Sequence, residues 1–433
     1  MRRATGRRDT RLAALRRAAT ALLVALLVGG CGGRDDNGAR VPGRGALTIY
    51  TSLPRHGDSS RAATAVLAAQ RLALADHHGR AGSRAVHLVE LDSSKPGGDG
   101  WDPGVVEQNA KQAASDPSTI AYLGELDTGG SAISIPVTND KEILQVSPYD
   151  GLTSLTQLQP GGPHTGPERY YPAGKTTFAR LVPTDLAQAV VLVDWARQEG
   201  AKRLVVVHDD EVYGRTLSAQ VIFMADQRGL PISDVKEAKS AGQPQDYAGL
   251  ARDIASDPKK RPDAVIYTGI ADRTAEPLVA ALARAIPGVK LYASSGVAVP
   301  GFTGPEPVRL VEPARPASQY PAAARRLLAR LGGQLGMKAA EVPTEALYGY
   351  ASMRLVLDAI DRAGSQGGDR PAVVAAALKG DRGRGPLGSL GLTPTGDVAD
   401  QRLAVYQRGP GGLAFLGLRR PQLPPAATGN ASK

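Results

Sequence analysis

The chain of 433 residues is long enough for two domains, and its 42% hydrophobic and 22% charged residues indicate a folded globular protein rather than a disordered one. Its net charge of +10 falls to +4 without residues 1–30, where seven Arg and one Asp contribute +6. The remainder is only mildly basic, which argues against a nucleic-acid-binding protein.

The N-terminal segment has the layout of a secretory signal peptide. An Arg-rich start precedes an apolar run over residues 18–28, far shorter than the roughly 20 apolar residues that a membrane-spanning helix needs. The run is followed closely by Cys31, the only cysteine, so no intramolecular disulfide can form. The stretch Leu27-Val28-Gly29-Gly30-Cys31 resembles the bacterial lipobox, in which the cysteine is lipidated and becomes the new N-terminus. We expect residues 1–30 to be a lipoprotein signal peptide, exported by the Sec route rather than by Tat. The alternative is a soluble secreted protein.

Residues 31–45 are polar and Gly-rich, and they predict a flexible tether. A regular alternation of strands and helices follows. Its pattern predicts strands at 47–51, 86–92, 121–123 and 143–146, with helices at 58–78, at 103–115 and after Gly130. Such alternation is typical of a parallel sheet covered by helices.

Residues 159–174 interrupt the pattern and predict a long excursion or a domain boundary. A second α/β series then begins, followed by a Pro-rich stretch, three helices, a terminal hairpin and a frayed tail. The expected strands are 177–182, 204–208, 232–235, 264–268, 289–293, 403–406 and 413–416, and the expected helices are 185–199, 213–228, 247–256, 274–285, 322–331, 344–363 and 371–378.

The most informative stretch runs from Ala121 to Pro148 and reads as one βαβ step. Between its first strand and its helix lies a turn of small and polar residues, Asp127-Thr128-Gly129-Gly130. Such a turn leaves backbone N–H groups free at the start of the helix. It therefore predicts a binding site for a carboxylate or a phosphate.

Motifs for catalysis are incomplete or missing in the sequence. A P-loop that ends at Gly174-Lys175-Thr176 would need a glycine at the position of Arg169. The stretch from Gly129 to Ile133 lacks the last glycine of a nucleophile elbow, and HExxH does not occur. We expect no enzyme activity, no cofactor and no metal. A degenerate secreted α/β enzyme stays an alternative.

Several motifs together resemble the type I periplasmic-binding proteins of ABC importers, specifically the branched-chain amino-acid-binding family. The resemblance covers most of residues 46–418. It is carried by Tyr122–Ser131, Gln145–Pro148, His208–Gly214, Tyr348–Ala363, Gly385–Gly388 and Thr395–Asp397.

The resemblance implies an α/β fold of two doubly wound parallel-sheet lobes joined by a three-crossing hinge. Lobe one is expected at residues 46–182 and 299–360, and lobe two at 183–298 and 361–418. Residues 419–433 are expected to form a disordered tail. The ligand is expected in the cleft at the carboxyl ends of the strands.

The resemblance also implies which residues contact the ligand. The expected contacts are Thr128, Gly129, Gly130, Tyr149, Asp150, Asp185, Tyr213 and Ser295. Backbone N–H groups of the Thr128 turn would hold an anionic group, and Tyr149 and Tyr213 would cover the ligand from opposite lobes. Helix capping is the alternative for Thr128 and Asp185, and packing is the alternative for Tyr213.

One departure from the family leaves the ligand open. The acidic residue that pairs with the ammonium of an amino acid falls at Ser295. A buried ammonium without a carboxylate is costly. Therefore either Asp127, Asp150 or Asp272 takes that role, or the ligand is not an α-amino acid.

The sequence thus predicts an extracytoplasmic solute-binding lipoprotein of an ABC importer that captures a small polar ligand in the cleft between the lobes, either an amino acid, for example a branched-chain one, or an amino-acid-like molecule. The expected partners are ABC permease subunits and the bacterial cell membrane, through a lipid anchor at Cys31. The protein is expected to be a monomer and to bind no nucleic acid. A ligand-sensing lipoprotein without a transport role is the alternative.

Overall fold

The structure is a computed structural model that describes residues 45–98, 100–161, 166–239, 245–270, 275–298, 307–380, 385–409 and 412–424. The predicted lipidation site Cys31, almost all of the tether, Asp272 and most of the tail lie outside these ranges. The chain divides into two units, Met1–Ala46 and Leu47–Lys433, and the folded elements belong to the second. In the described residues, no helix is both long and apolar enough to cross a membrane.

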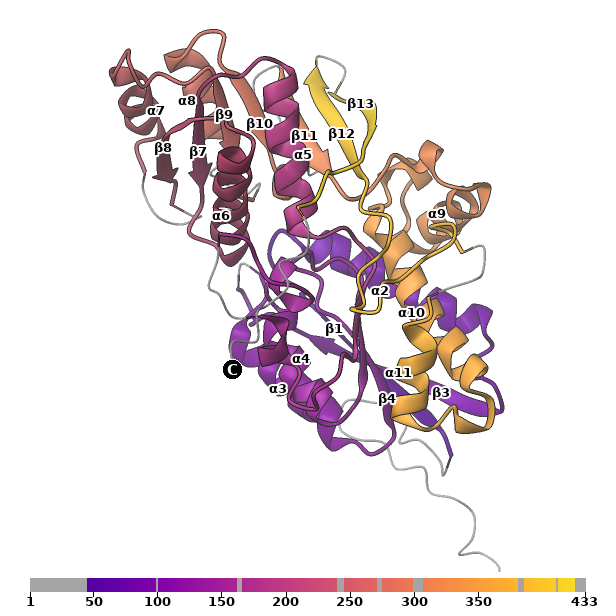
Figure 1. The fold of residues 1–433 in the computed structure, drawn as a ribbon. Helices are drawn as coiled ribbons and strands as arrows, with labels where there is room; N and C mark the ends of the chain where they lie inside the picture. Colours follow the sequence, from indigo (N-terminus) through magenta and orange to yellow (C-terminus); the bar gives the residue numbers. More distant parts are fainter. Residues whose placement is uncertain are drawn as a thin grey trace, which may run out of the picture. The chain divides into compact units, whose positions relative to one another are not determined.

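The first sheet has six strands in the order β2-β3-β1-β4-β5-β6 (Figure 1). All neighbours pair in parallel except β2 and β3, which form an antiparallel hairpin. The strands are β1 (Leu47–Leu53), β2 (Arg80–Ala81), β3 (Arg84–Asp92), β4 (Thr119–Leu123), β5 (Leu144–Ser147) and β6 (Phe178–Arg180).

The second sheet has seven strands in the order β13-β12-β11-β10-β9-β7-β8. Strands β7 to β11 pair in parallel, and β12 and β13 add an antiparallel edge. The strands are β7 (Leu204–His208), β8 (Ile232–Glu237), β9 (Ala264–Tyr267), β10 (Lys290–Ala293), β11 (Val308–Glu312), β12 (Leu403–Gly409) and β13 (Gly412–Arg419).

Ten α-helices cover the two sheets in the described residues. They are α2 (Ser60–Asp76), α3 (Pro103–Ser115), α4 (Ser131–Asp140), α5 (Asp185–Gln198), α6 (Val212–Gln227), α7 (Tyr247–Ser256), α8 (Ala275–Ala285), α9 (Ala322–Leu335), α10 (Glu345–Ala363) and α11 (Arg370–Ala377). The predicted α/β class with parallel-dominant sheets is therefore confirmed.

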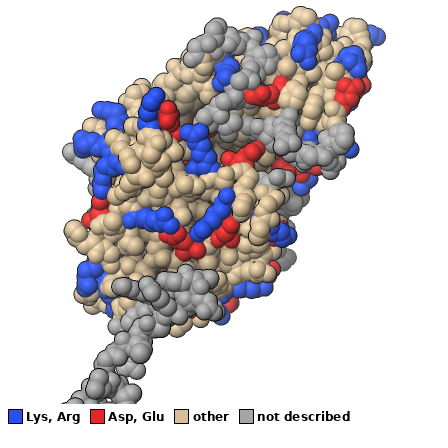
Figure 2. All heavy atoms as spheres, turned by 180° about the vertical axis from the view of Figure 1, so that it is seen from behind, with Lys and Arg blue, Asp and Glu red and all other residues tan. Residues whose placement is uncertain are grey.

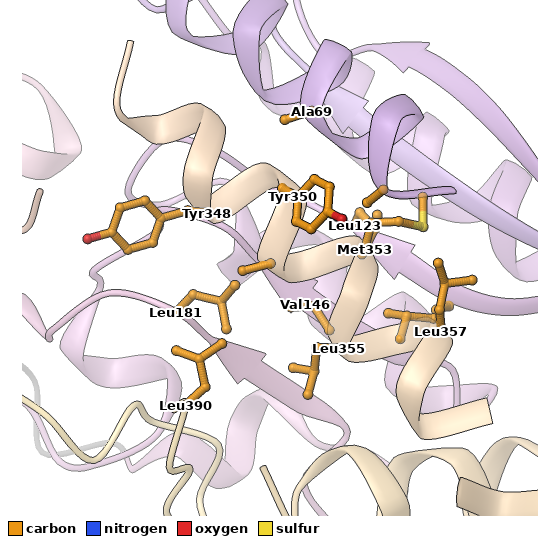
Figure 3. Packing of buried hydrophobic residues seen from close by; sticks show 14 of the residues in the cluster. Ala69, Leu123, Val146, Leu181, Tyr348, Tyr350, Met353, Leu355, Leu357 and Leu390 are labelled. Carbon is orange, nitrogen blue, oxygen red and sulfur yellow. The ribbon is translucent and has the colours of Figure 1, made fainter. Parts of the chain in front are cut away.

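The core of the first sheet is built around α10, which packs against α2 and the strands. Met353 of this helix lies beside Leu123 of β4, and Leu355 and Val146 of β5 belong to the same buried cluster (Figure 3). Burial of this aliphatic surface is the main stabilising contribution on this side. The second sheet has its own clusters, one against α5 and α6 and another against α7 and α8.

Two elements differ from the expected lobe boundaries. Strand β11, expected in lobe one, pairs with β10 and β12 of the second sheet. Helix α11, expected in lobe two, packs in the core of the first sheet, and Arg370 at its start donates to the carbonyl of Thr119. The chain therefore crosses between the sheets after β6, after β11 and again just before β12. The period of apolar residues shows which face of an element is buried but not against which sheet.

Charged side chains do not gather in one place on the face that Figure 2 shows. Lys and Arg side chains are interspersed there with Asp and Glu side chains.

The end of the chain also differs from the prediction, because Arg419 is the last residue of β13 rather than part of a tail.

Candidate functional site

The turn after β4 is shaped by a buried acid, Glu125. Its carboxyl group accepts hydrogen bonds from the hydroxyls of Ser52 (2.9 Å) and Tyr122 (2.6 Å). Burial raises the pKa of Glu125 to about 8. A Cβ at Gly130 would lie 2.8 Å from the Glu125 side chain, so this position has room for glycine only. Gly130 therefore has a packing role, and its predicted ligand contact is not needed to explain it.

Helix α4 starts at an anionic group, as the turn predicts, but the group belongs to the chain itself. The backbone N–H of Ser131 donates to Oδ2 of Asp150 (3.1 Å), and the N–H of Leu152 donates to Oδ1 (3.0 Å). Asp150 is fully buried, and burial raises the pKa of its carboxyl group against these hydrogen bonds. The N–H of Ser131 therefore already has an acceptor within the chain, and the expectation that the N–H groups of the preceding turn hold an anion of the ligand stays a prediction.

A buried arginine, Arg180, donates a hydrogen bond to the backbone of Asp150. The guanidinium of Arg180 donates to the carbonyl oxygen of Asp150 (3.1 Å) and to the hydroxyl of Thr156 (3.0 Å). Its Nε lies 2.8 Å from Oδ1 of Asp397 in an ion pair. Sequence analysis missed Arg180, since a single basic residue in a short strand carries no motif.

Thr128, Gly151 and Asp185 come together from three separate segments. The N–H of Gly151 donates to the hydroxyl of Thr128 (3.3 Å), and the N–H of Asp185 donates to the carbonyl of Gly151 (2.8 Å). A Cβ at Gly151 would overlap Oδ1 of Asp185, so glycine is required beside this carboxyl group. Thr128 and Asp185, two of the residues expected to contact the ligand, are thus both linked to Gly151, and their contact with a ligand stays a prediction.

Asp185 is a buried carboxyl group with an unused oxygen. The residue is 4% exposed, and its Oδ2 has no hydrogen-bond partner in the described part of the chain. Burial and the charge of Asp150 raise its pKa to about 7, although the nearby Thr128 hydroxyl and the charge of Arg180 oppose the shift.

Helix capping does not explain either residue. Thr184 caps α5, because its hydroxyl accepts from the N–H of Ala187 (3.3 Å). The N-cap position of α4 is Gly130 rather than Thr128. The capping alternative for Thr128 and Asp185 is therefore wrong.

Asp127 provides a second carboxylate oxygen without a partner. Its Oδ1 accepts from the hydroxyl of Ser59 (2.5 Å), whereas Oδ2 has no partner among the described residues. Burial raises the pKa of Asp127 to about 6, and the charge of Asp150 contributes. The charge of Asp150 therefore contributes to the raised pKa of both Asp127 and Asp185.

Tyr213 and Ser295 meet on the side of the second sheet. The hydroxyl of Tyr213 donates to Oε1 of Gln188 (3.0 Å) and lies 2.9 Å from the hydroxyl of Ser295. The N–H of Ser295 donates to the same Oε1 atom (2.6 Å). Burial and then the charge of Asp185 raise the pKa of Tyr213, so Asp185 lies near this group. Sequence analysis missed Gln188, which lies three residues after Asp185 on α5.

The motif around Tyr213 has a structural reason of its own. The carboxylate of Asp209 accepts from the N–H groups of Ile270 (2.8 Å) and Glu211 (3.3 Å). A Cβ at Gly214 would overlap Oδ1 of Asp209. The aspartate and the glycine of the motif therefore hold the loop before α6, which places Tyr213.

Two contacts bring the Thr128 turn to the start of α6. Gly129 has a φ of +106°, which favours glycine, and a Cβ there would lie 3.0 Å from Cγ1 of Val212. The hydroxyl of Thr153 also donates to Oε1 of Gln220 on α6 (3.0 Å). Gly129 therefore permits the close approach of the Thr128 turn to the start of α6.

Tyr149 is occupied by contacts within the protein. Its hydroxyl donates to Glu312 at the end of β11, and its ring meets the ring of Tyr348 edge-on at 5.2 Å between centroids. Burial and the charge of Glu312 raise its pKa. These contacts join the two sides, and a contact of Tyr149 with the ligand stays a prediction.

Another cluster of possible ligand atoms lies at the end of α2. Atoms of His77, Asp358 and Asp361 lie within 4.8 Å of one another. Asp358 already pairs with Arg354 at 3.2 Å, and Asp361 accepts from the N–H of Gly82. A cation would have to compete with Arg354, so this cluster carries no metal-site assignment.

The comparison with known proteins agrees with this fold. A family model described as periplasmic binding protein matches residues 48–412. The chain belongs to the periplasmic binding protein family. This confirms the resemblance that the sequence motifs indicated. The family is one of solute-binding proteins rather than enzymes. No curated protein matches the chain.

Solved structures of periplasmic binding proteins share the fold at low sequence identity. A leucine-binding protein from Thermotoga maritima is 21% identical, with a TM-score of 0.68 over 87% of this chain and 99% of that one. An ABC transporter substrate-binding protein from Desulfitobacterium hafniense in complex with Leu is 16% identical, with a TM-score of 0.66 over 86% and 100%. A solute-binding protein from R. palustris in complex with benzoate is 17% identical, with a TM-score of 0.68 over 87% and 97%.

Proposed function

We propose that this periplasmic binding protein is the extracytoplasmic solute-binding lipoprotein of an ABC importer. It captures a small polar ligand, an amino acid or a related molecule, and delivers it to the permease subunits. The chain acts as a receptor and not as an enzyme. The structural neighbours that bind leucine or benzoate support a small-molecule ligand.

One observation carries this proposal. Asp185 lies beside Thr128 and Gly151 on one side and near Tyr213 on the other, and one of its carboxylate oxygens has no partner within the described ranges. Buried polar atoms in folded proteins are almost always hydrogen-bonded, so an exception at the meeting point of two sides indicates a ligand. The proposed contacts are Thr128, Gly129, Asp185, Tyr213 and Ser295.

The location and the partners are part of the same proposal. The apolar segment before Cys31 supports cleavage and lipidation at that cysteine, and residues 31–45 would then tether the fold to the outer face of the cell membrane. Accumulation of an uncleaved precursor in the presence of globomycin, or loss of membrane association in Cys31→Ser, tests this anchor. A Cys31→Ser protein that stays in the membrane fraction contradicts it.

The binding role is tested by thermal shift on the mature chain with leucine, benzoate, amides, short peptides and sugars. A true ligand raises Tm, because binding to the native state alone stabilises it. The double variant Thr128→Ala/Tyr213→Ala should lose most of that rise. An unchanged rise with a verified ligand contradicts the site. If cells that lack this protein still take up the ligand at the normal rate, that result favours the ligand-sensing alternative.

A further inference from the structure

A groove of about 1130 Å³ lies where α5 and α6 end, beside the segment that follows β13. The described residues that line it include none of the expected ligand contacts. The groove is therefore separate from the candidate site, and a solute-binding role does not explain its side chains.

This groove is strongly basic. One acid and five bases line it, so its net charge is +4; they are Asp194, Arg197, Lys202, Arg228, Arg419 and Arg420. The whole chain without residues 1–30 also has a net charge of +4. The rest of that chain is therefore neutral in sum, and its positive excess equals the charge of this one groove.

The acids at the groove already have basic partners. Oδ1 of Asp194 lies 2.9 Å from Nε of Arg228, and Oε2 of Glu199, at the end of α5, lies 2.5 Å from Nε of Arg309. Each acid thus compensates one arginine. The other cations of the groove keep their charge without a counterion in the part of the chain that the structure describes.

Arg419 is a half-buried cation of this kind. Its guanidinium donates to the neutral side chain of Gln198 and lies over the ring of Trp195, 4.8 Å from the centroid. Burial lowers the pKa of Arg419, although the charges of Glu199 and Asp194 oppose the shift. An anion in the groove would compensate this desolvated charge.

Three further cations, Arg197, Lys202 and Arg420, are exposed. Within the described ranges their side chains form neither an ion pair nor a hydrogen bond. Arg197 lies in the last turn of α5, where a cation interacts favourably with the helix dipole. Lys202 and Arg420 lie outside the helices, so stabilisation of a helix end does not explain them.

An exposed leucine beside the groove favours a membrane over a soluble anion. The carbonyl of Gln422 accepts a hydrogen bond from Arg228 (2.8 Å), which holds the segment after β13 in place. Leu423, the next residue, is exposed. Surfaces that bind anionic membranes combine cations, which contact the headgroups, with apolar side chains that enter the interface.

We propose that this groove binds the phosphate headgroups of an anionic phospholipid membrane through Arg197, Lys202 and Arg420, and that Leu423 enters the interface. This contact goes beyond the proposed function, because it requires neither the lipid anchor nor a solute. It is compatible with the anchor, since a tether of residues 32–45 would span up to roughly 50 Å when extended and leave the folded part free to turn this face to the membrane.

The test is sedimentation with lipid vesicles. The chain of residues 32–433 carries no lipid and contains the whole folded unit. One set of vesicles holds equal parts of phosphatidylglycerol and phosphatidylcholine, and the other holds phosphatidylcholine alone. We expect binding to the anionic vesicles only, and we expect it to weaken as salt is added, because salt screens exposed charges.

The decisive variant combines Arg197→Gln, Lys202→Gln and Arg420→Gln. It should fold, because the three exposed side chains have no bonds to lose within the described residues. Its partition coefficient on anionic vesicles should fall about tenfold or more. Leu423→Ala should weaken binding several-fold, since less apolar surface leaves water.

The matched control combines Arg284→Gln, Arg326→Gln and Lys379→Gln. It removes the same charges at three exposed positions outside the groove. At physiological ionic strength it should bind vesicles much like the parent chain, because distant charges are screened there.

Each outcome bears on the groove alone. Equal binding to both kinds of vesicle, or an equal loss in the two triple variants, overturns the proposal. A Tm rise with inorganic phosphate or an oligonucleotide that needs the three cations, without vesicle binding, assigns the groove to a soluble anion and also overturns it. Unchanged binding in Leu423→Ala rejects the insertion of that side chain. The Tm rise with a verified solute, measured on the same variants, tests the solute-binding function separately.

Discussion

The Oδ2 atom of Asp150 accepts a hydrogen bond from the backbone N–H of Ser131 at 3.1 Å and so closes the start of α4 with a carboxylate from the loop after β5. A helix N-terminus favours negative charge because its first N–H groups lack partners within the helix. The chain satisfies that preference itself. The N–H of Ser131 is therefore not free at the start of α4.

Asp150→Ala should destabilise the protein more than Asp150→Asn. The alanine leaves the N–H groups of Ser131 and Leu152 buried without acceptors, which costs on the order of 2–4 kcal/mol in the free energy of unfolding. Asparagine keeps one acceptor oxygen and should lose about half as much. Denaturant unfolding measures both values, and equal stabilities would contradict the role given to these hydrogen bonds.

The contribution of Asp185 to stability should fall as pH rises from about 4 to about 7. Its folded-state pKa of about 7 lies above the ordinary value of 3.8, so the folded chain binds the proton more tightly. The stabilisation is complete below the unfolded-state pKa and is lost as pH rises through 7.

Asp185→Asn should therefore be more stable than the parent above pH 7, by on the order of 1–4 kcal/mol. Unfolding curves at several pH values check the sign. Asp127, with its pKa of about 6, should contribute in the same direction, and Asp127→Asn is the parallel variant. Curves of parent and Asp185→Asn that run parallel over the whole range would show that Asp185 does not titrate in this window.

Gly151→Ala should destabilise the protein by about 1–3 kcal/mol, because the added Cβ overlaps the buried carboxyl group of Asp185. In the Asp185→Ala background the overlap disappears and the cost should shrink, which a double-mutant cycle measures. Gly333→Ala is the matched control, since a Cβ there meets nothing within 4 Å. It should be neutral or stabilising by up to about 1 kcal/mol, as Ala favours a helix over Gly.

Arg180→Met should cost about 3–5 kcal/mol, because it leaves Asp397 with no counterion at a largely buried place. Arg180→Met combined with Asp397→Leu should recover much of the loss, since no uncompensated charge remains. Differential scanning calorimetry gives both values. A double variant as unstable as the single one would mean that Arg180 acts mainly through Asp150 and Thr156.

Much of the fold could be predicted from residue patterns alone. The pattern of apolar residues predicts both α7 and β7 at the bounds that the structure shows. Such patterns are informative because these elements depend on residues that are close to one another along the chain. The pattern missed β11, a short strand after a Pro-rich stretch. It also assigned α11 to the wrong core, since no local signal says which sheet a helix face meets.

The amino-acid sequence by itself determined the two α/β series, the helix start after the Thr128 turn that favours an anion, and a set of polar residues at strand ends. Only the tertiary structure decided that Asp150 occupies that helix start, that Gln188 joins Tyr213 to Ser295, and that one oxygen of Asp185 has no partner among the described residues. Backbone periodicity depends on residues a few positions apart. The partner of a buried polar side chain depends on which distant segments meet, and these pairings therefore become visible only in the folded chain.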